Sequence, residues 1–304
     1  MSIDMNPDES ASEPVHRRDT VRGPGSSGAP TGQQRPRRRR MLTLTVQGRE
    51  RIGRHFARLT LGGGDFRHLE RIGYDQSGRL FFAGPGRTEV VLPTSERWML
   101  RYTLQPSAQR PRVRTYTIRR FRPETSAFDI EVSLHGEHAH GEQTSDGPAA
   151  PGTAWALTAE PGDKVAFLDE GCRYAPTPGA AWQLLVGDES ALPAILAILE
   201  RTTDALPAEV FLEIPTRDDI RREVVAPAAT TIHWLPRDDP SMRPGTLALR
   251  VVRDARLRPG PFYTWTAGES SLATGIRRHL VGERDVPRSD IAFRGYWRSG
   301  RASF

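Results

Sequence analysis

The 304-residue sequence has little cysteine, little lysine and no long apolar run. Its single cysteine, Cys172, cannot form a disulfide within the chain, which favours a reducing compartment and a packed side chain rather than a catalytic thiol. No apolar run approaches the roughly 20 residues that span a bilayer, and the polar N-terminus lacks the apolar segment of a secretory signal. We therefore expect a soluble, cytoplasmic protein without membrane insertion.

Positive charge is carried almost entirely by arginine. Lys and Arg together number 43 against 37 Asp and Glu, which gives a formal net charge of +6, and Lys164 is the only lysine. With abundant Ala, Gly and Pro, this composition is typical of a GC-rich genome. The arginine excess therefore does not by itself indicate a nucleic-acid ligand, and we expect no nucleic acid among the partners.

Residues 1–40 contain almost no large apolar side chains and end in a basic run at 35–40. Such a segment cannot bury enough apolar surface to offset its ordering entropy, so we expect a disordered tail. The basic run could contact nucleic acid or anionic lipid, although a solvated tail is the favoured interpretation. A protein that starts at Met41 is a further alternative, which mass spectrometry of the native N-terminus would test.

Residues 41–177 show short apolar segments separated by Gly, Pro and polar turns. This rhythm predicts a small antiparallel β-barrel domain. The candidate strands are residues 42–46, 58–61, 89–92, 114–118, 128–134, 155–157 and 164–168.

From residue 178 to 304 the rhythm changes to strands that alternate with helices. This alternation predicts an α/β domain with an open parallel sheet covered on both faces. The expected strands are 182–186, 210–214, 231–235, 262–267 and 291–296, and the expected helices are 191–199, 247–253 and 270–280. A ligand cleft between the two domains is a natural consequence of this plan.

The most informative motif is the hexapeptide Arg114-Thr115-Tyr116-Thr117-Ile118-Arg119. In a strand, Arg114 and Tyr116 share one face while Thr117 and Arg119 share the other. An aromatic ring beside a fixed cation suits a ligand with a flat ring and a phosphate, such as a flavin nucleotide, which would lie along the edge of this strand. An ordinary arginine-rich strand is the alternative.

Two further segments of the first domain carry candidate binding residues. The expected strand that contains Val132 ends at His135, which is either a structural hydrogen-bonding residue or a contact to a ring edge or phosphate. The small-residue turn around Gly152 and Thr153 lets backbone N–H groups approach an anion, and a helix that began there would favour phosphate.

The second domain has two similar segments at the ends of its expected strands. Gly187-Asp188-Glu189-Ser190 opens a helix with Ser190 as a candidate N-cap, and Ala267-Gly268-Glu269 opens another. Ligands of open α/β sheets bind at this edge. No GxGxxG motif is present, so an ordinary dinucleotide-binding fingerprint is unsupported, and capped helices are the alternative interpretation.

Several histidines and glutamates between 135 and 142 form a loose cluster. Their HxxHxH spacing fits no standard closed metal site, so we expect a loop and assign no metal ligand.

The ordered combination of RxYTxR, HG, a small-residue turn before Trp155, GDExALPAI, WxAGE and GYWRxG resembles the siderophore-interacting proteins. These are flavin-dependent ferric-siderophore reductases of the ferredoxin-reductase-like superfamily, and the resemblance covers residues 41–300. It implies an FAD-binding β-barrel at 41–177 and an NAD(P)H-binding α/β domain at 178–304. The implied activity passes electrons from NADPH or NADH through FAD to a ferric siderophore, in a protein expected to be monomeric.

The resemblance also implies roles for single residues. Arg114 would pair with the flavin phosphates, Tyr116 would stack on the isoalloxazine ring and Thr117 would hydrogen-bond it. The remaining implied cofactor-binding residues are Arg119, Val132, His135, Gly152 and Thr153 for FAD, and Asp188, Glu189, Ala267, Gly268 and Glu269 for the nicotinamide. Candidates for a basic pocket that holds the anionic chelate are Arg112, Arg119 and Arg298.

No catalytic side chain is assigned, because the cofactor carries the electron chemistry. The chain departs from the family pattern in an insertion at 137–149, in Ser190 where threonine is usual, and in its N-terminal tail.

Three other functions stay open at this point: a flavin reductase with another acceptor, a siderophore carrier without turnover, and a nucleic-acid-binding protein suggested only by the tail. Arg217, Arg221 and Arg222 could meet the 2′-phosphate of NADPH, but the sequence does not decide between NADPH and NADH.

Overall fold

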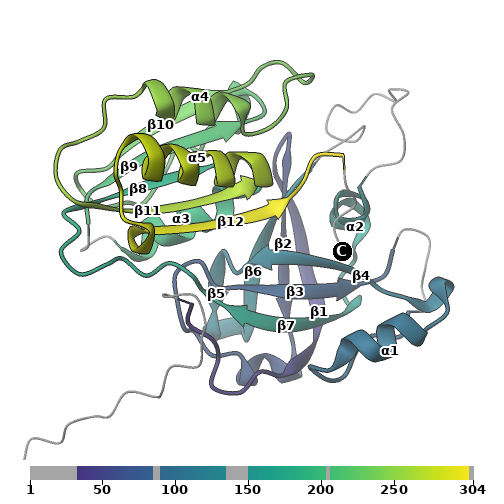
Figure 1. The fold of residues 1–304 in the computed structure, drawn as a ribbon. Coiled ribbons are helices and arrows are strands. Elements are labelled where there is room, and N and C mark those ends of the chain that lie inside the picture. Colours follow the sequence, from purple (N-terminus) through teal and green to yellow (C-terminus); the bar gives the residue numbers. More distant parts are fainter. Residues whose placement is uncertain (1–32, 85–89, 135–149, 203–205, 301–304) are drawn as a thin grey trace, which may run out of the picture. The chain divides into compact units, whose positions relative to one another are not determined.

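The computed structural model describes residues 33–84, 90–134, 150–202 and 206–300, which form a seven-stranded and a five-stranded sheet (Figure 1). Residues 1–32 of the expected tail lie outside the described residues. At its end, Gln34 pairs with Cys172 in an isolated antiparallel bridge. Within the described part of the chain, no helix is long and apolar enough to cross a membrane.

The seven-stranded sheet is antiparallel throughout. Its strands are β1 (Met41–Gly53), β2 (Phe56–Gly62), β3 (Ser77–Phe82), β4 (Arg112–Thr117), β5 (Arg120–Arg122), β6 (Ala127–Ser133) and β7 (Lys164–Gly171), in the order β4-β3-β7-β1-β2-β6-β5. The two end strands, β4 and β5, are separated in the chain by only two residues. The sheet therefore curls until its edges approach one another, which gives a barrel whose strand ladder is not hydrogen-bonded all the way round.

Alternation along the strands builds the barrel core. In β1 the buried side chains of Leu42, Leu44 and Val46 alternate with more exposed neighbours, as expected for a strand with one face in the core. Phe128 of β6 and Phe167 of β7 meet inside, with ring centres 5.0 Å apart.

Three expectations for this half were wrong or incomplete. Residues 155–157 belong to helix α2 (Pro151–Thr158), because Pro151 starts the first turn and Trp155 stacks on Phe82 at 4.5 Å between ring centres. Residues 90–92 are irregular, and residue 89 lies outside the described residues. We predicted no strand at β3 or β5 and no helix at α1 (Trp98–Leu104) from the sequence.

The five-stranded sheet is entirely parallel, as predicted. Its strands are β8 (Trp182–Gly187), β9 (Ala208–Ile214), β10 (Thr231–Pro236), β11 (Phe262–Glu269) and β12 (Ile291–Trp297), in the order β10-β9-β8-β11-β12. The order reverses between β8 and β11, which makes their carboxyl ends the topological switch point where such sheets bind ligands.

Helices cover both faces of this sheet. Helix α3 (Leu192–Arg201) packs with Leu185 and Val210 on one face, whereas α4 (Thr246–Asp254) and α5 (Ser270–Glu283) pack with Leu184 and Val186 on the other. Neighbouring strand residues thus face opposite layers, which explains why the strands are apolar without alternation.

Buried polar contacts join the two sheets. His55 Nδ1 lies 2.7 Å from Asp219 Oδ2, and the Trp265 indole donates to Asp75 Oδ2 at 2.9 Å. Phe56, from the start of β2, is completely buried in the cluster around α3. These contacts attach the start of β2 and the segment before β3 to the second half of the chain.

Candidate functional site

The start of α2 lies directly against β4. A Cβ atom at Gly152 would lie 2.6 Å from the Tyr116 hydroxyl and 3.8 Å from Arg114 Cγ. With Tyr116 in its observed position, only glycine fits there. The fold thus brings together Arg114, Tyr116 and Gly152, which the sequence offered in two separate motifs.

Arg114, Tyr116 and Gly152 form a corner that combines a positive helix end, a guanidinium and an aromatic ring. The first N–H groups of a helix have no partner within the helix, and their dipole favours an anion. Burial raises the pKa of the Tyr116 phenol, while the Arg114 charge acts in the opposite direction, so the phenol stays neutral. Such a donor set fits a ligand that carries phosphates and a flat ring, as FAD does.

The C-terminal aromatic motif reaches the same strand. The Tyr296 phenol is hydrogen-bonded to the buried Thr117 side chain, and burial raises its pKa. Arg294 lies 5.7 Å from the centre of the Tyr296 ring and donates to Ser77 Oγ at 3.2 Å. Two motifs that are about 180 residues apart in the chain therefore contact one another at the end of β4.

Asp188 occupies the switch point and is completely buried. Its Oδ1 accepts hydrogen bonds from the Ser190 amide at 2.9 Å and hydroxyl at 2.6 Å, and its Oδ2 accepts from the Glu269 amide at 2.6 Å and the Trp297 indole at 3.3 Å. Burial, followed by the nearby Glu189 charge, raises its pKa to about 7. Gly268 is required here, because a Cβ atom would lie 2.6 Å from Asp188 Cγ.

The neighbouring carboxylates are also held by protein groups. Glu189 pairs with Arg237 through two contacts of 2.7 and 2.8 Å, and Arg237 also donates to Glu213 at 2.8 Å. Glu269 accepts from Arg243 at 2.6 Å and from the Ser271 amide at 2.5 Å. These acidic side chains thus shape the sheet edge through internal ion pairs and hydrogen bonds.

Ser190 does not cap α3 as predicted. The residue before the helix is Ala191, which has no side-chain capping bond, and the Ser190 hydroxyl is drawn to Asp188 instead.

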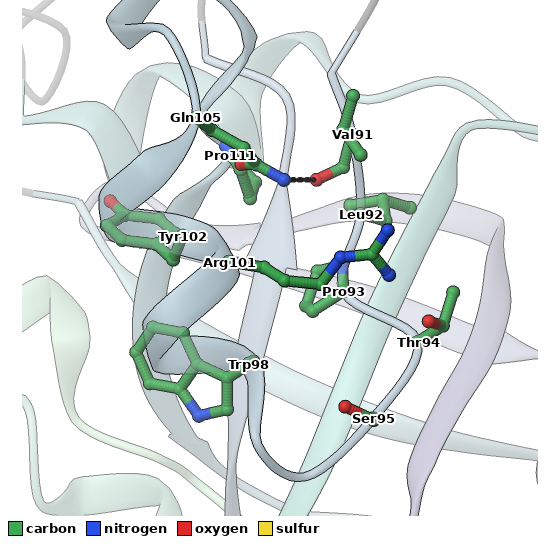
Figure 2. Close-up of a pocket in the computed structure, with 10 residues that line it drawn as sticks. All are labelled: Val91, Leu92, Pro93, Thr94, Ser95, Trp98, Arg101, Tyr102, Gln105 and Pro111. Atoms are coloured by element: carbon green, nitrogen blue, oxygen red, sulfur yellow. Dashed lines mark hydrogen bonds between the residues drawn. The ribbon is translucent and has the colours of Figure 1, made fainter.

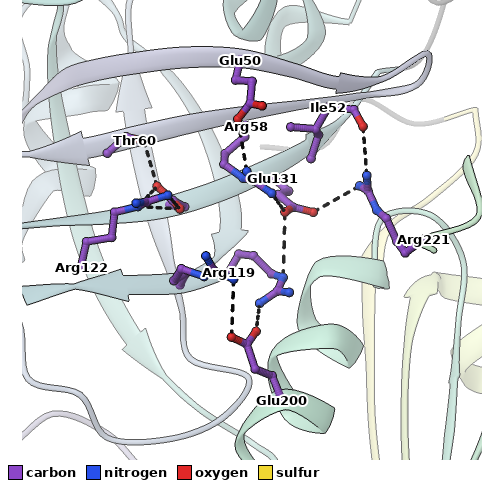
Figure 3. Close-up of polar contacts among 11 residues, drawn as sticks. Glu50, Ile52, Arg58, Thr60, Arg119, Arg122, Glu131, Glu200 and Arg221 are labelled. Atoms are coloured by element: carbon purple, nitrogen blue, oxygen red, sulfur yellow. Dashed lines mark hydrogen bonds and ion pairs between the residues drawn. The ribbon is translucent and has the colours of Figure 1, made fainter. Parts of the chain in front are cut away.

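Arg119 points away from the corner formed by Arg114, Tyr116 and Gly152. Its guanidinium pairs with Glu200 of α3 and lies 3.9 Å from Glu131 of β6 (Figure 3). Its charge is thus directed to the contact between the two sheets.

The other predicted residues are more scattered. Val132 is buried in the barrel core, and Thr153 is buried in the first turn of α2. Arg112, opposite Phe82 at the start of β4, and Arg298, just after β12, are exposed. His135 lies outside the described residues, as does the histidine and glutamate cluster that follows it.

Among the three arginines considered for a 2′-phosphate, Arg217 has a contact that places it at the carboxyl edge of the parallel sheet. It lies 3.6 Å from Asp238, so the two residues that follow β9 and β10 meet at the carboxyl ends of these strands. Arg221 instead donates to the Ile52 carbonyl at 3.1 Å and to Glu131 at 3.3 Å, which turns it toward the barrel (Figure 3). Arg222 is exposed.

A small pocket beside α1 was not indicated by any motif (Figure 2). Figure 2 shows Arg101 extended toward Leu92 and Pro93, while Gln105 donates to the Val91 carbonyl at 3.4 Å. None of the predicted site residues lines it.

Comparison with known proteins connects both halves of the chain to one family. Residues 45–174 match the model of the siderophore-interacting FAD-binding domain, and residues 180–300 match that of the siderophore-interacting protein. The ferric vibriobactin reductase ViuB of Vibrio cholerae is 29% identical over 260 residues, which cover 82% of this chain and 86% of ViuB.

Solved structures agree with these matches. A siderophore utilization protein from T. fusca has a TM-score of 0.73 at 30% identity, covering 88% of this chain and 95% of that one. A ferredoxin NADP+ reductase from Neisseria gonorrhoeae, with bound FAD and NADP, shares the fold at a TM-score of 0.57 and 10% identity, covering 85% of this chain and 99% of that one.

Proposed function

Because the chain belongs to the siderophore-interacting protein family, we propose that it is an FAD-dependent reductase that passes electrons from NADPH or NADH to a ferric siderophore. The observation that carries this proposal is the close fit of Gly152 against Tyr116 and Arg114. This fit brings the start of α2 next to a guanidinium and an aromatic ring, the groups that would hold a phosphate and a flat ring. We assign residues 41–177 to FAD and residues 178–304 to the nicotinamide nucleotide.

Arg114 and the amides of Gly152 and Thr153 would hold the FAD phosphates. Tyr116 would lie against the isoalloxazine ring, and Thr117 would be oriented toward it by the Tyr296 phenol. Because Tyr116 is neutral and Thr117 is fixed by a hydrogen bond, these residues position the ring and exclude water without exchanging protons with it.

When bound, FAD supplies the conversion of a two-electron hydride transfer from the nicotinamide into one-electron transfers to the iron. The switch point between β8 and β11 would receive the nicotinamide, since open parallel sheets bind ligands at the strand ends where the strand order reverses. Reduction of the iron weakens its bonds to the hard oxygen donors of a siderophore, so that the metal is released as Fe(II).

The substrate is an anionic chelate, and exposed arginines near β4 and β12 would attract it. Arg112 and Arg298 are the candidates. Replacing either with alanine should raise the KM for the ferric chelate and leave the KM for the nicotinamide unchanged. Arg250→Ala, on the exposed side of α4, is the matched control and should change neither value.

Anaerobic spectroscopy of the FAD-loaded protein tests the proposal. NADPH or NADH should bleach the visible flavin absorbance, and a ferric siderophore should restore it with two ferrous ions captured per nicotinamide oxidised, because a hydride carries two electrons. Failure to bind FAD would refute the proposal. Bleaching that only another acceptor reverses would identify a different flavin reductase, and siderophore binding without bleaching would identify a carrier.

A further inference from the structure

A charged cleft lies between the barrel and the C-terminal end of α3. Its volume is about 400 Å³, within the range of small-ligand sites. The residues that line it are Arg71, Tyr74, Arg119, Arg120, Phe121, Glu200 and Arg201. Four guanidinium groups therefore face one carboxylate.

Fixed contacts build this cleft. Arg201 donates to the carbonyl oxygens of Gly73 and Tyr74 at 3.0 and 3.2 Å. The guanidinium carbons of Arg201 and Arg71 lie 5.6 and 6.0 Å from the centre of the Phe121 ring. Carbonyl dipoles and a ring face orient these cations but do not neutralise them.

The carboxylate present cannot balance the charge. Glu200 pairs with Arg119 and lies 3.7 Å from Arg120, whose side chain remains 53% exposed. Burial, followed by the nearby Arg71 charge, lowers the pKa of the Arg201 guanidinium to about 10. Cations held this close around one lining carboxylate repel one another, and a bound oxyanion would relieve that repulsion.

The cleft is separate from the proposed flavin and nicotinamide sites. Helix α3 begins near the switch point at Leu192 and ends at Arg201, so its ten residues place the cleft roughly 15 Å away along the helix. Apart from Arg119, none of the residues assigned to FAD or the nicotinamide lines it.

We propose that this cleft binds a small, multiply charged oxyanion, bearing phosphate or carboxylate groups, that competes with Glu200 for Arg119 and Arg120. A guanidinium recognises either group in the same bidentate geometry. Glu200 belongs to α3, whereas Arg119 and Arg120 follow β4. A bound oxyanion would therefore replace the ion pair between α3 and the barrel with a bridge through the ligand.

Calorimetric titration of the FAD-loaded protein at constant ionic strength tests this proposal, with inorganic pyrophosphate and citrate as probes. Saturable binding of either probe is expected, and binding of only one identifies the anionic group. Arg71→Gln and Arg120→Gln should each weaken binding at least tenfold, whereas Arg250→Gln on α4 should not. Glu200→Gln should strengthen it, because the competing carboxylate is gone.

Two results would overturn the proposal: no saturable binding of either probe, or binding that survives unchanged in both cleft variants. The FAD content of every variant is measured alongside. The outcome does not depend on the proposed reductase activity, since binding is read without nicotinamide or iron.

Discussion

The backbone amide of Glu269 donates to Asp188 Oδ2 at 2.6 Å, which joins the carboxyl ends of β11 and β8 through one buried side chain. The Trp297 indole adds the end of β12 to the same carboxylate. The switch point of the parallel sheet is thus organised around an acidic group whose protonation changes with pH.

Asp188 should make folding stability depend on pH. Burial raises its pKa from 3.8 to about 7, so the unfolded chain loses this proton first. The stabilising contribution is therefore complete below about pH 4 and is lost as pH rises toward 7, by on the order of 4 kcal/mol in total. Urea denaturation between pH 4 and 8 should show this slope in the wild type and a flatter one in Asp188→Asn.

Ser190→Ala provides a second variant for the same prediction. The Ser190 hydroxyl lowers the folded-state pKa of Asp188, so its removal should extend the loss of stability to higher pH. Identical pH profiles for all three proteins would contradict the role given to Asp188.

Gly152→Ala should reduce FAD affinity by more than tenfold, because the new Cβ would displace the Tyr116 hydroxyl. Adding Tyr116→Phe removes that hydroxyl, and the double variant should recover most of the affinity. Fluorescence titration with FAD measures both effects. Gly282→Ala in α5, where a Cβ meets nothing within 4 Å, is the control and should bind FAD normally. A double variant no better than Gly152→Ala would disprove the steric explanation.

Glu131→Gln should destabilise the fold by about 3 kcal/mol. Glu131 is 6% exposed and lies 3.0 Å from Arg58, 3.3 Å from Arg221 and 3.9 Å from Arg119, so its neutralisation leaves three guanidinium groups together (Figure 3). Chemical denaturation measures the loss.

Glu50→Gln is the matched control, since Glu50 also pairs with Arg58 but has a side chain that is 64% exposed. Its cost should be below about 1 kcal/mol. Equal costs for the two variants would show that burial does not determine the strength of this network.

Trp265→Phe should lower the free energy of unfolding by roughly 1–3 kcal/mol, because it leaves the buried Asp75 carboxylate without its indole donor. Asp75 would keep the amides of Arg173 and Tyr174, both at 2.9 Å. Trp234→Phe, at a half-buried position of β10, controls for loss of ring volume. A larger effect at Trp234 than at Trp265 would mean that packing, and not the hydrogen bond, dominates.

The sequence by itself determined the two kinds of sheet and the order of their motifs. Alternation in residues 42–46 and continuous apolar runs such as 182–186 follow from whether one or both faces of a strand are buried, which is a local property. Arg114, Tyr116 and Gly152 were also predicted from their residue types, and their role in binding stays a prediction. Local signals failed at residues 155–157, where the contact between Trp155 and Phe82 accompanies a helix rather than the expected strand.

Only the tertiary structure decided how the motifs meet. Thr117 and Tyr296 are distant in the chain but share a hydrogen bond. Asp188 connects the ends of β8, β11 and β12, and no regular spacing in the sequence indicates that these ends meet. Arg119 carried the same motif signal as Arg114, yet Glu200 on α3 draws it to the opposite side. A side chain's partner depends on which surfaces are packed together, and that long-range packing leaves no local pattern in the sequence.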